Sequence, residues 1–248
     1  MRYLAIVSYE GTQYHGFQSQ KNAVGIQDLI EKAFRLMTQT TIKIHSAGRT
    51  DKGVHACGQA FHFDSDLDFD NDRWLKVNRR LPLDIRILSV NRVAVDFHAR
   101  HWAKSKKYRY VIAKQPSSVF DANHEVYVEN FMIEPVKEAI PYFIGTHDYR
   151  GFCQLVKGKP TIKTIYNIEI KETERHYHFI IHGNSFLKYM VRSMMGTLIQ
   201  IGKQRLEPEI IKEILTTQNR KLAGKTAEAR GLYLDQIYYE EDHDVYHI

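Results

Sequence analysis

The chain has 248 residues, of which 43% are hydrophobic and 26% charged, a composition that is ordinary for a globular protein. It carries 35 lysines and arginines against 29 acids, and the formal net charge of +6 favours a polyanionic partner. Its two cysteines, Cys57 and Cys153, form neither a disulfide framework nor a Cys-x-x-Cys motif. The sequence opens without a secretory signal pattern, and no apolar run reaches the ~20 residues of a membrane helix. We therefore expect a cytoplasmic protein that binds no membrane.

The predicted elements of the first half follow the order β-α-β-β-α-β. An apolar run predicts a strand at residues 3–9, and apolar residues at helical spacing predict a helix at 25–37. Two further strands flank the polar segment 45–55. A helix is expected at 71–80, where Leu81-Pro82 ends it, and a strand at 84–95. This order is that of the ferredoxin-like unit.

The second half has a similar order of elements without a repeat in its residues. We predict strands at 106–113, 162–171, 177–182 and 231–239, and helices at 134–144, 185–201 and 206–216. No Pro-rich or Gly/Ser-rich linker separates the halves. The predicted fold class is therefore α+β, with two ferredoxin-like halves that share a mixed, mainly antiparallel central sheet. The predicted domains are residues 1–105 and 106–248.

One carboxylate stands among cations in the segment His-Ser-Ala-Gly-Arg-Thr-Asp-Lys-Gly-Val-His at residues 45–55. Asp51 has Arg49 and Lys52 beside it, and His45 and His55 at the ends of the segment. Neighbouring cations favour the ionised carboxylate, which is then available as a nucleophile or a base. A Thr-Asp turn stabilised by local hydrogen bonds would also explain these residues. The residues by themselves leave both interpretations open.

A second segment, residues 97–114, has the composition of a nucleic-acid surface. It holds six lysines and arginines and no acid, with Trp102, Tyr108 and Tyr110 among them. Cations bind phosphates with release of counterions, and aromatic faces stack on unpaired bases for about 1–3 kcal/mol each. A solvated charged strand with tyrosines in the core is equally consistent with this pattern.

No cofactor or metal motif is complete. Gly224-Lys225-Thr226 ends like a phosphate-binding loop, but Asn219 stands where the first glycine belongs. The group of His55, Cys57 and His62 has no second pair of zinc ligands. We predict that the protein needs no cofactor and no metal.

Three blocks of the sequence resemble one known family. Residues 48–55 (Gly-Arg-Thr-Asp-Lys-Gly-Val-His), followed by Gly58-Gln59 and His62-Phe63, resemble the active-site loop of the tRNA pseudouridine synthase A (TruA) family. Residues 97–100 with 107–110 resemble a second block of that family, and residues 183–192 a third. The likeness spans nearly the whole chain and implies the pseudouridine synthase fold.

The resemblance also implies roles for individual residues. Asp51 would be catalytic, and Arg192 would pair with it, although its place at the polar boundary of the predicted helix also suits a solvent-facing arginine. Tyr108 would stack on the target uracil, and Arg49 would help to bind the substrate. The residues implied to bind RNA are Phe97, His98, Ala99, Arg100, His101 and Lys107.

The implied activity is a cofactor-free isomerisation of uridine to pseudouridine in tRNA, at positions 38, 39 and 40 of the anticodon stem-loop, by a homodimer. Two other classes remain open. A non-catalytic tRNA-binding protein would explain the basic aromatic segment. A ribonuclease would use His55, His62 or His98 as acid and base.

Overall fold

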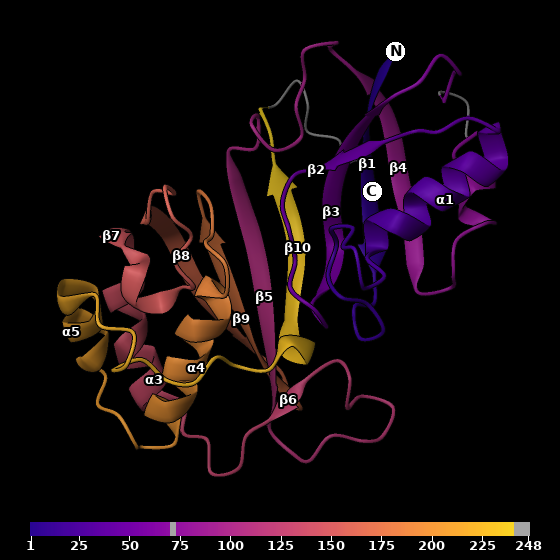
Figure 1. Cartoon of the computed structure of the whole chain (residues 1–248). Coiled ribbons are helices and arrows are strands. Elements are labelled where there is room, and N and C mark those ends of the chain that lie inside the picture. Colours follow the sequence, from indigo (N-terminus) through magenta and orange to yellow (C-terminus); the bar gives the residue numbers. More distant parts are fainter. Residues whose placement is uncertain (70–72, 241–248) are drawn as a thin grey trace. The chain divides into compact units, whose positions relative to one another are not determined.

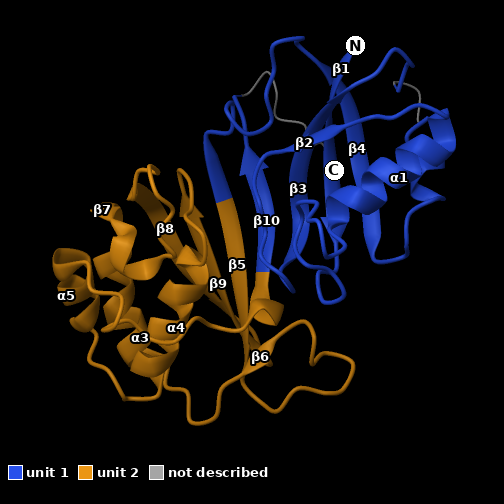
Figure 2. Cartoon of the chain, in the orientation of Figure 1, with its two compact units in different colours: residues 1–106, 233–248 blue, residues 107–232 orange. Residues whose placement is uncertain are grey.

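The computed structural model describes residues 1–69 and 73–240, and these form two compact units (Figure 2). Unit 1 contains residues 1–106 and the segment from Tyr233 onward, and unit 2 contains residues 107–232. The chain crosses from one unit to the other within strand β5 (Ser105–Ala113) and returns at the start of β10 (Leu232–Tyr238). In the described part of the chain, no helix has the length and apolar character that crossing a membrane requires.

Unit 1 has the ferredoxin-like arrangement (Figure 1). Strand β1 lies between β3 and β4 and is antiparallel to both, and β2 is antiparallel to β3. The strand order β4-β1-β3-β2 is therefore that of the predicted β-α-β-β-α-β unit. Strand β10 adds a short parallel pairing, Tyr233 with His55 and Leu234 with Ala56. The elements of this unit are β1 (Arg2–Tyr9), α1 (Ile26–Thr38), β2 (Ile44–Ser46), β3 (His55–Asp64), α2 (Leu75–Asn78) and β4 (Ile85–Val93).

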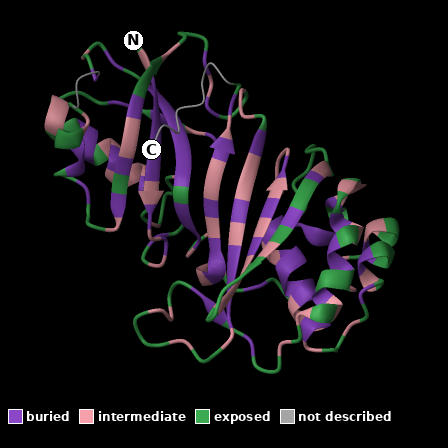
Figure 3. Cartoon of the chain, turned by 180° about the vertical axis from the view of Figure 1, so that it is seen from behind, coloured by how far each residue is buried: buried purple, intermediate pink, exposed green. Residues whose placement is uncertain are grey.

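Aromatic rings fill the core between α1 and the strands of unit 1. The ring centroid of Phe34 in α1 lies 4.8 Å from that of Phe63 in β3, and the Phe63 ring stacks on Tyr3 of β1 with 5.4 Å between centroids. The helix begins at Ile26, one residue after the predicted start, because Gly25 caps it: the Asp28 carboxylate accepts a hydrogen bond of 2.8 Å from the Gly25 N–H. Buried apolar residues lie along the strands (Figure 3). This packing makes β1 and β3 a fixed base for the loops at their ends.

Unit 2 places three helices against its own strands, whose order is β5-β9-β8-β7 (Figure 1). Strands β7, β8 and β9 are antiparallel, and β6 pairs in parallel with β5. Ten of the 13 residues of α4 are buried, so this helix is the centre of the unit. The remaining elements are β6 (Val126–Tyr127), α3 (Glu134–Ala139), β7 (Gly145–Asp148), β8 (Ile162–Glu172), β9 (His176–Gly183), α4 (Met190–Gly202) and α5 (Ile210–Thr217), with 3-10 turns at Ile140–Phe143, Tyr149–Phe152 and Ala229–Gly231.

The predicted start of the long helix at residue 185 is wrong, because α4 begins at Met190. Tyr189 has φ of 62°, in the left-handed region, which a right-handed helix cannot include. The residues before it bond elsewhere. The side chain of Asn184 accepts hydrogen bonds from the Thr164 and Ser185 N–H groups, and Lys188 accepts one from the Gln154 N–H.

Other helix boundaries also differ from the prediction. The helix predicted at 134–144 divides into α3 and a 3-10 turn at Pro141, which has no N–H to continue an α-helix. The helix predicted at 206–216 begins only at Ile210, two residues after Pro208. Of the helix predicted at 71–80, residues 71 and 72 lie outside the described residues and only Leu75–Asn78 are helical. The short strands β6 and β7 were not predicted.

The ten strands among the described residues belong to a mixed sheet in which most pairings are antiparallel, with α-helices packed against it. The prediction of an α+β fold with a mixed, mainly antiparallel sheet is therefore confirmed.

Asn78 is a buried polar residue whose removal should destabilise unit 1. Its amide donates to the Ile87 carbonyl and accepts from the Ile87 N–H, both at 2.8 Å. Asn78→Ala leaves both buried backbone groups of β4 without these partners, and we expect it to lower the free energy of unfolding by about 2–4 kcal/mol. Urea unfolding measures this loss. Asn91→Ala, at an exposed position of the same strand, is the control, and equal losses for the two variants would contradict the assignment.

Candidate functional site

The Asp51 loop, residues 47–54, connects β2 to β3, and its first two residues are held by three hydrogen bonds. The Ala47 N–H donates to the Ala60 carbonyl of β3 at 2.8 Å, and the Lys106 ammonium donates to the Ala47 carbonyl at 2.8 Å. The buried amide of Gln59 donates to the Gly48 carbonyl at 2.9 Å. The start of the loop is therefore fixed to the sheet of unit 1.

The N-terminal loop that follows β1 supports the other side of the Asp51 loop. Gly16 has φ of +86°, and a Cβ at this position would lie 2.3 Å from the Thr50 carbonyl oxygen, so only glycine allows this approach. The Gly53 N–H donates to the Tyr14 carbonyl at 3.3 Å. These contacts hold the backbone of Asp51 between two segments that are distant in the sequence.

Side chains of the Arg-Thr-Asp triplet point to different environments. Thr50 is buried, and its hydroxyl shares a hydrogen bond of 2.8 Å with the Tyr9 hydroxyl. Arg49 and Lys52 are exposed, and Asp51 is half-buried. The buried threonine anchors the triplet, and the half-buried Asp51 lies between Arg49 and Lys52 in the sequence. Such a group is able to act as a nucleophile or a base.

His55, at the end of the loop, packs as part of the core of unit 1. It is 1% exposed, its ring stacks on Tyr233 at 4.7 Å, and its Nδ1 accepts a hydrogen bond of 3.0 Å from the Gly11 N–H. A carboxylate oxygen of Glu10 lies 3.3 Å from the same nitrogen. The burial of this imidazole is consistent with a structural role rather than that of a ribonuclease acid or base.

A row of four histidines lies on the same unit. The His62 ring contacts those of His45 and His98 at centroid distances of 4.9 and 4.6 Å, and His98 contacts His101 at 4.2 Å. Burial, followed by the charges of His98, His45 and Arg2, lowers the pKa of His62 to about 4, although Asp64 opposes the shift. His62 is therefore neutral near pH 7. Among residues 1–69 and 73–240, no cluster of His, Cys, Asp or Glu is arranged to hold a metal ion.

The segment 97–101 alternates between anchors and accessible side chains. Phe97 and Ala99 are fully buried, and their carbonyls accept hydrogen bonds from Arg2 at 2.9 Å and from the Tyr239 hydroxyl at 2.7 Å. His98 is half-buried, whereas Arg100 and His101 are exposed. Of the five residues predicted to bind RNA in this segment, only these last three have side chains that are accessible to solvent.

In unit 2, Tyr108 lies in β5 with only 9% of its surface exposed. The Phe186 ring meets it edge-on, 5.0 Å away and at 77°. Its neighbour Lys107 is half-buried. The sequence did not single out Phe186 as a partner of Tyr108, although it lies inside the third block of the resemblance. The contact holds the Tyr108 ring in one orientation.

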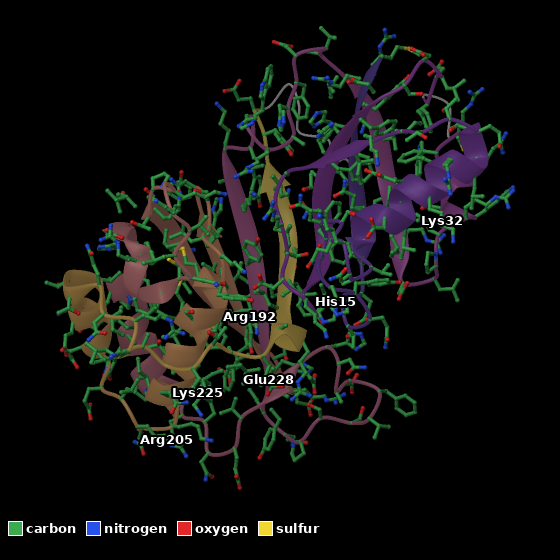
Figure 4. The ribbon with its side chains drawn as sticks, viewed as in Figure 1. His15, Lys32, Arg192, Arg205, Lys225 and Glu228 are labelled. Atoms are coloured by element: carbon green, nitrogen blue, oxygen red, sulfur yellow. The ribbon has the colours of Figure 1, made fainter. Side chains whose placement is uncertain are left out.

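Arg192 lies in α4 and is tied to the segment that follows α5. Its Nε donates to the Ala227 carbonyl at 2.7 Å, and the Ala227 N–H donates to the Arg192 carbonyl at 2.9 Å. The guanidinium also lies 5.3 Å from the centre of the Tyr189 ring. Figure 4 labels Arg192 and Glu228, the residue after Ala227. The side chain is half-buried, which agrees with the boundary position predicted for it.

A further arginine, which the sequence did not indicate, organises this segment. Arg220 donates to the Gly224 carbonyl at 3.1 Å, and it also contacts the hydroxyls of Ser193 and Thr226 at 3.3 and 3.1 Å. It therefore bridges α4 and the residues that lead to Ala227. A sequence pattern gives no sign of this role, because the partners are backbone and hydroxyl groups.

The lowered pKa of His62 predicts how stability depends on pH. The unfolded chain takes up a proton at this residue as the pH falls below about 6.5, whereas the folded chain does so only near pH 4. The contribution of His62 to the free energy of unfolding is thus fully present above pH 6.5. Acidification to pH 4 removes about 2–3 kcal/mol of it. His62→Asn keeps an acceptor for the Ala99 N–H without titrating. Urea unfolding at several pH values should show a flatter dependence for this variant, and an unchanged slope would contradict the assignment.

Comparison with known proteins identifies the family. The family model for tRNA pseudouridine synthase matches residues 5–101 and 139–240. A protein of Onion yellows phytoplasma named tRNA pseudouridine synthase A is 37% identical over 238 residues, which cover 96% of this chain and 98% of that protein. A Bacillus cereus protein named tRNA pseudouridine synthase A 1 is 41% identical, with 94% and 96% covered, and a Staphylococcus saprophyticus tRNA pseudouridine synthase A is 40% identical, with 96% and 91% covered. Since the matches extend over nearly its whole length, the chain belongs to the tRNA pseudouridine synthase family.

Proposed function

We propose that this chain isomerises uridine to pseudouridine at positions 38, 39 and 40 of the anticodon stem-loop of tRNA. Members of its family are isomerases that form pseudouridine in tRNA. The choice of positions is supported by the resemblance of residues 48–55 to the active-site loop of tRNA pseudouridine synthase A. The observation that carries the proposal is the half-buried Asp51 carboxylate on a backbone that is held from both sides.

The reaction exchanges one bond of the nucleoside for another. The bond between N1 of uracil and C1′ of ribose breaks, a bond between C5 and C1′ forms, C5 loses a proton and N1 gains one. Substrate and product have the same composition, so the balance includes no oxidant, reductant or second substrate. A target base inside a helical stack must first turn outward, because its reacting atoms are inaccessible there.

In this proposal each predicted residue has one task. Asp51 is the nucleophile or base during the exchange, and Arg192 is the cation that keeps this carboxylate ionised and oriented. Tyr108, with its ring held by Phe186, stacks on the uracil. Arg49, which is exposed and close to Asp51 in the sequence, contacts the substrate.

RNA backbone contacts come from His98, Arg100, His101 and Lys107. The cations Arg100 and Lys107 would bind phosphates, whereas His98 and His101 would contribute hydrogen bonds, and the protein would recognise the shape of the stem-loop rather than its bases. Phe97 and Ala99 would support the segment from inside, since their side chains are buried.

We include in the proposal a cytoplasmic homodimer in which residues 1–105 carry the catalytic loop and residues 106–248 complete the RNA-binding surface. The family resemblance supports these points. A mass near 29.1 kDa for the protein in solution, measured by light scattering, would contradict the dimer.

Mapping of pseudouridine in cells tests the proposal and separates it from its alternatives. Cells that lack this chain should lose the carbodiimide-reactive pseudouridines at positions 38, 39 and 40 of their tRNAs, and the wild-type chain should restore them. Asp51→Ala should restore none, because the reacting carboxylate is gone, although the variant still binds tRNA in a filter assay.

Asp66→Ala, which removes an exposed carboxylate elsewhere in unit 1, is the matched control and should restore all three positions. Restoration by Asp51→Ala would remove this residue from the mechanism. An unchanged pattern in cells without the chain would favour a protein that only binds tRNA, and shortened tRNA would favour a ribonuclease.

A further inference from the structure

The ammonium of Lys106 lies at the start of the Asp51 loop rather than on the open surface. Lys106 belongs to the first part of β5, in unit 1, and its side chain is half-buried. It donates a hydrogen bond of 2.8 Å to the carbonyl of Ala47, a residue that is 1% exposed. Burial, and then the charge of Arg100, lowers the pKa of Lys106 to about 8. The Lys106 ammonium therefore lies in a buried environment, which disfavours its charged form.

Gly48, the next residue of the loop, leaves the space that the ammonium occupies. A Cβ at Gly48 would lie 2.7 Å from the Lys106 Nζ, closer than such atoms approach. The backbone of Gly48 is not among the positive-φ glycines, so its conformation is open to other residues. A Cβ at Gly48 would therefore require the Lys106 ammonium, the end of a flexible side chain, to move from its place beside the Ala47 carbonyl.

Two neighbouring carbonyls of the loop are held by different kinds of donor. The Gly48 carbonyl accepts from the neutral amide of Gln59, whereas the Ala47 carbonyl accepts from the charged Lys106. A hydrogen bond from a charged donor is stronger than one from a neutral group. The bond to Lys106 is therefore well suited to fix the point from which the loop leads to Asp51.

We propose that Lys106 is a positioning residue for the isomerisation. Its ammonium fixes the backbone at Ala47 and Gly48, and through that backbone it sets the position of the Asp51 carboxylate. A larger residue at position 48 would displace the ammonium. The inference rests on the proposed role of Asp51.

The test compares two variants that break the same contact from opposite sides. Lys106→Met removes the ammonium and keeps most of the side-chain length, whereas Gly48→Ala introduces the Cβ that pushes the ammonium away. Each should lower the single-turnover rate of tritium release from tRNA labelled at C5 of uridine by on the order of 10- to 100-fold, since small misplacements of reacting groups cost rates of that size. The Kd for tRNA should change by less than about threefold, because binding energy comes from many phosphate contacts.

The double variant and two further substitutions complete the experiment. The double variant Gly48→Ala with Lys106→Met should react no more slowly than either single variant, because both substitutions break the same hydrogen bond between Lys106 and Ala47. Lys106→Arg restores a charged donor and should recover most of the rate. Lys32→Met, which removes an exposed lysine of α1, is the control and should react like wild type.

The inference would be overturned if Lys106→Met released tritium at the wild-type rate, or if its weaker binding of tRNA fully accounted for a slower rate. It would also be overturned if the rate losses of the two single variants multiplied in the double variant. Urea unfolding of each variant shows whether a slow rate comes from a loss of folding. If Lys106 acts by positioning, the variants should have nearly normal urea midpoints although their turnover is slow. A wild-type protein that releases no tritium would instead refute the proposed function itself.

Discussion

The constraint on which the rest depends is the fixed backbone around Asp51. A carboxylate on a free loop would sample many positions and spend little time at the reacting atoms, whereas a held loop has already lost that freedom before substrate arrives. The core of unit 1 supplies the fixed points: Ala60 and Gln59 of β3 on one side, and Tyr14 and Gly16 on the other. In the proposed function, the aromatic packing between α1 and the strands therefore supports the position of the reacting group as well as the stability of unit 1.

Polar residues near this loop divide into those that are buried in unit 1 and those that are accessible to solvent. Thr50 and His55 face inward and bond to Tyr9 and Gly11, so their hydrogen-bonding capacity serves the fold. His62 is neutral because it is buried beside other histidines, and its Nδ1 already accepts from the Ala99 N–H. This arrangement weakens the ribonuclease alternative, which needs histidines that exchange protons near neutral pH. Within the proposed function, Asp51 is the group on this loop that carries out the covalent step.

The sequence predicted the features that are written in local patterns. Helical spacing gave α1, an apolar run gave β1, and the segment around Asp51 gave the candidate loop. It missed what depends on distant partners. Tyr9, Gln59 and Lys106 reach the loop only because the sheet brings them there, and no spacing rule indicates such contacts. The start of α4 was wrong for a similar reason: Asn184 bonds to Thr164 of a neighbouring strand, and Tyr189 turns left-handed before the helix begins.

The most direct test of this account changes the position of the Asp51 carboxylate without changing its charge. Asp51→Glu lengthens the side chain by one methylene, which moves the carboxylate by about 1 Å on a backbone that does not yield. Single-turnover tritium release from C5-labelled tRNA is the measurement. The account predicts a rate at least 100-fold below wild type with an unchanged Kd for tRNA. A rate close to that of wild type would show that the fixed loop is not what places the reacting group.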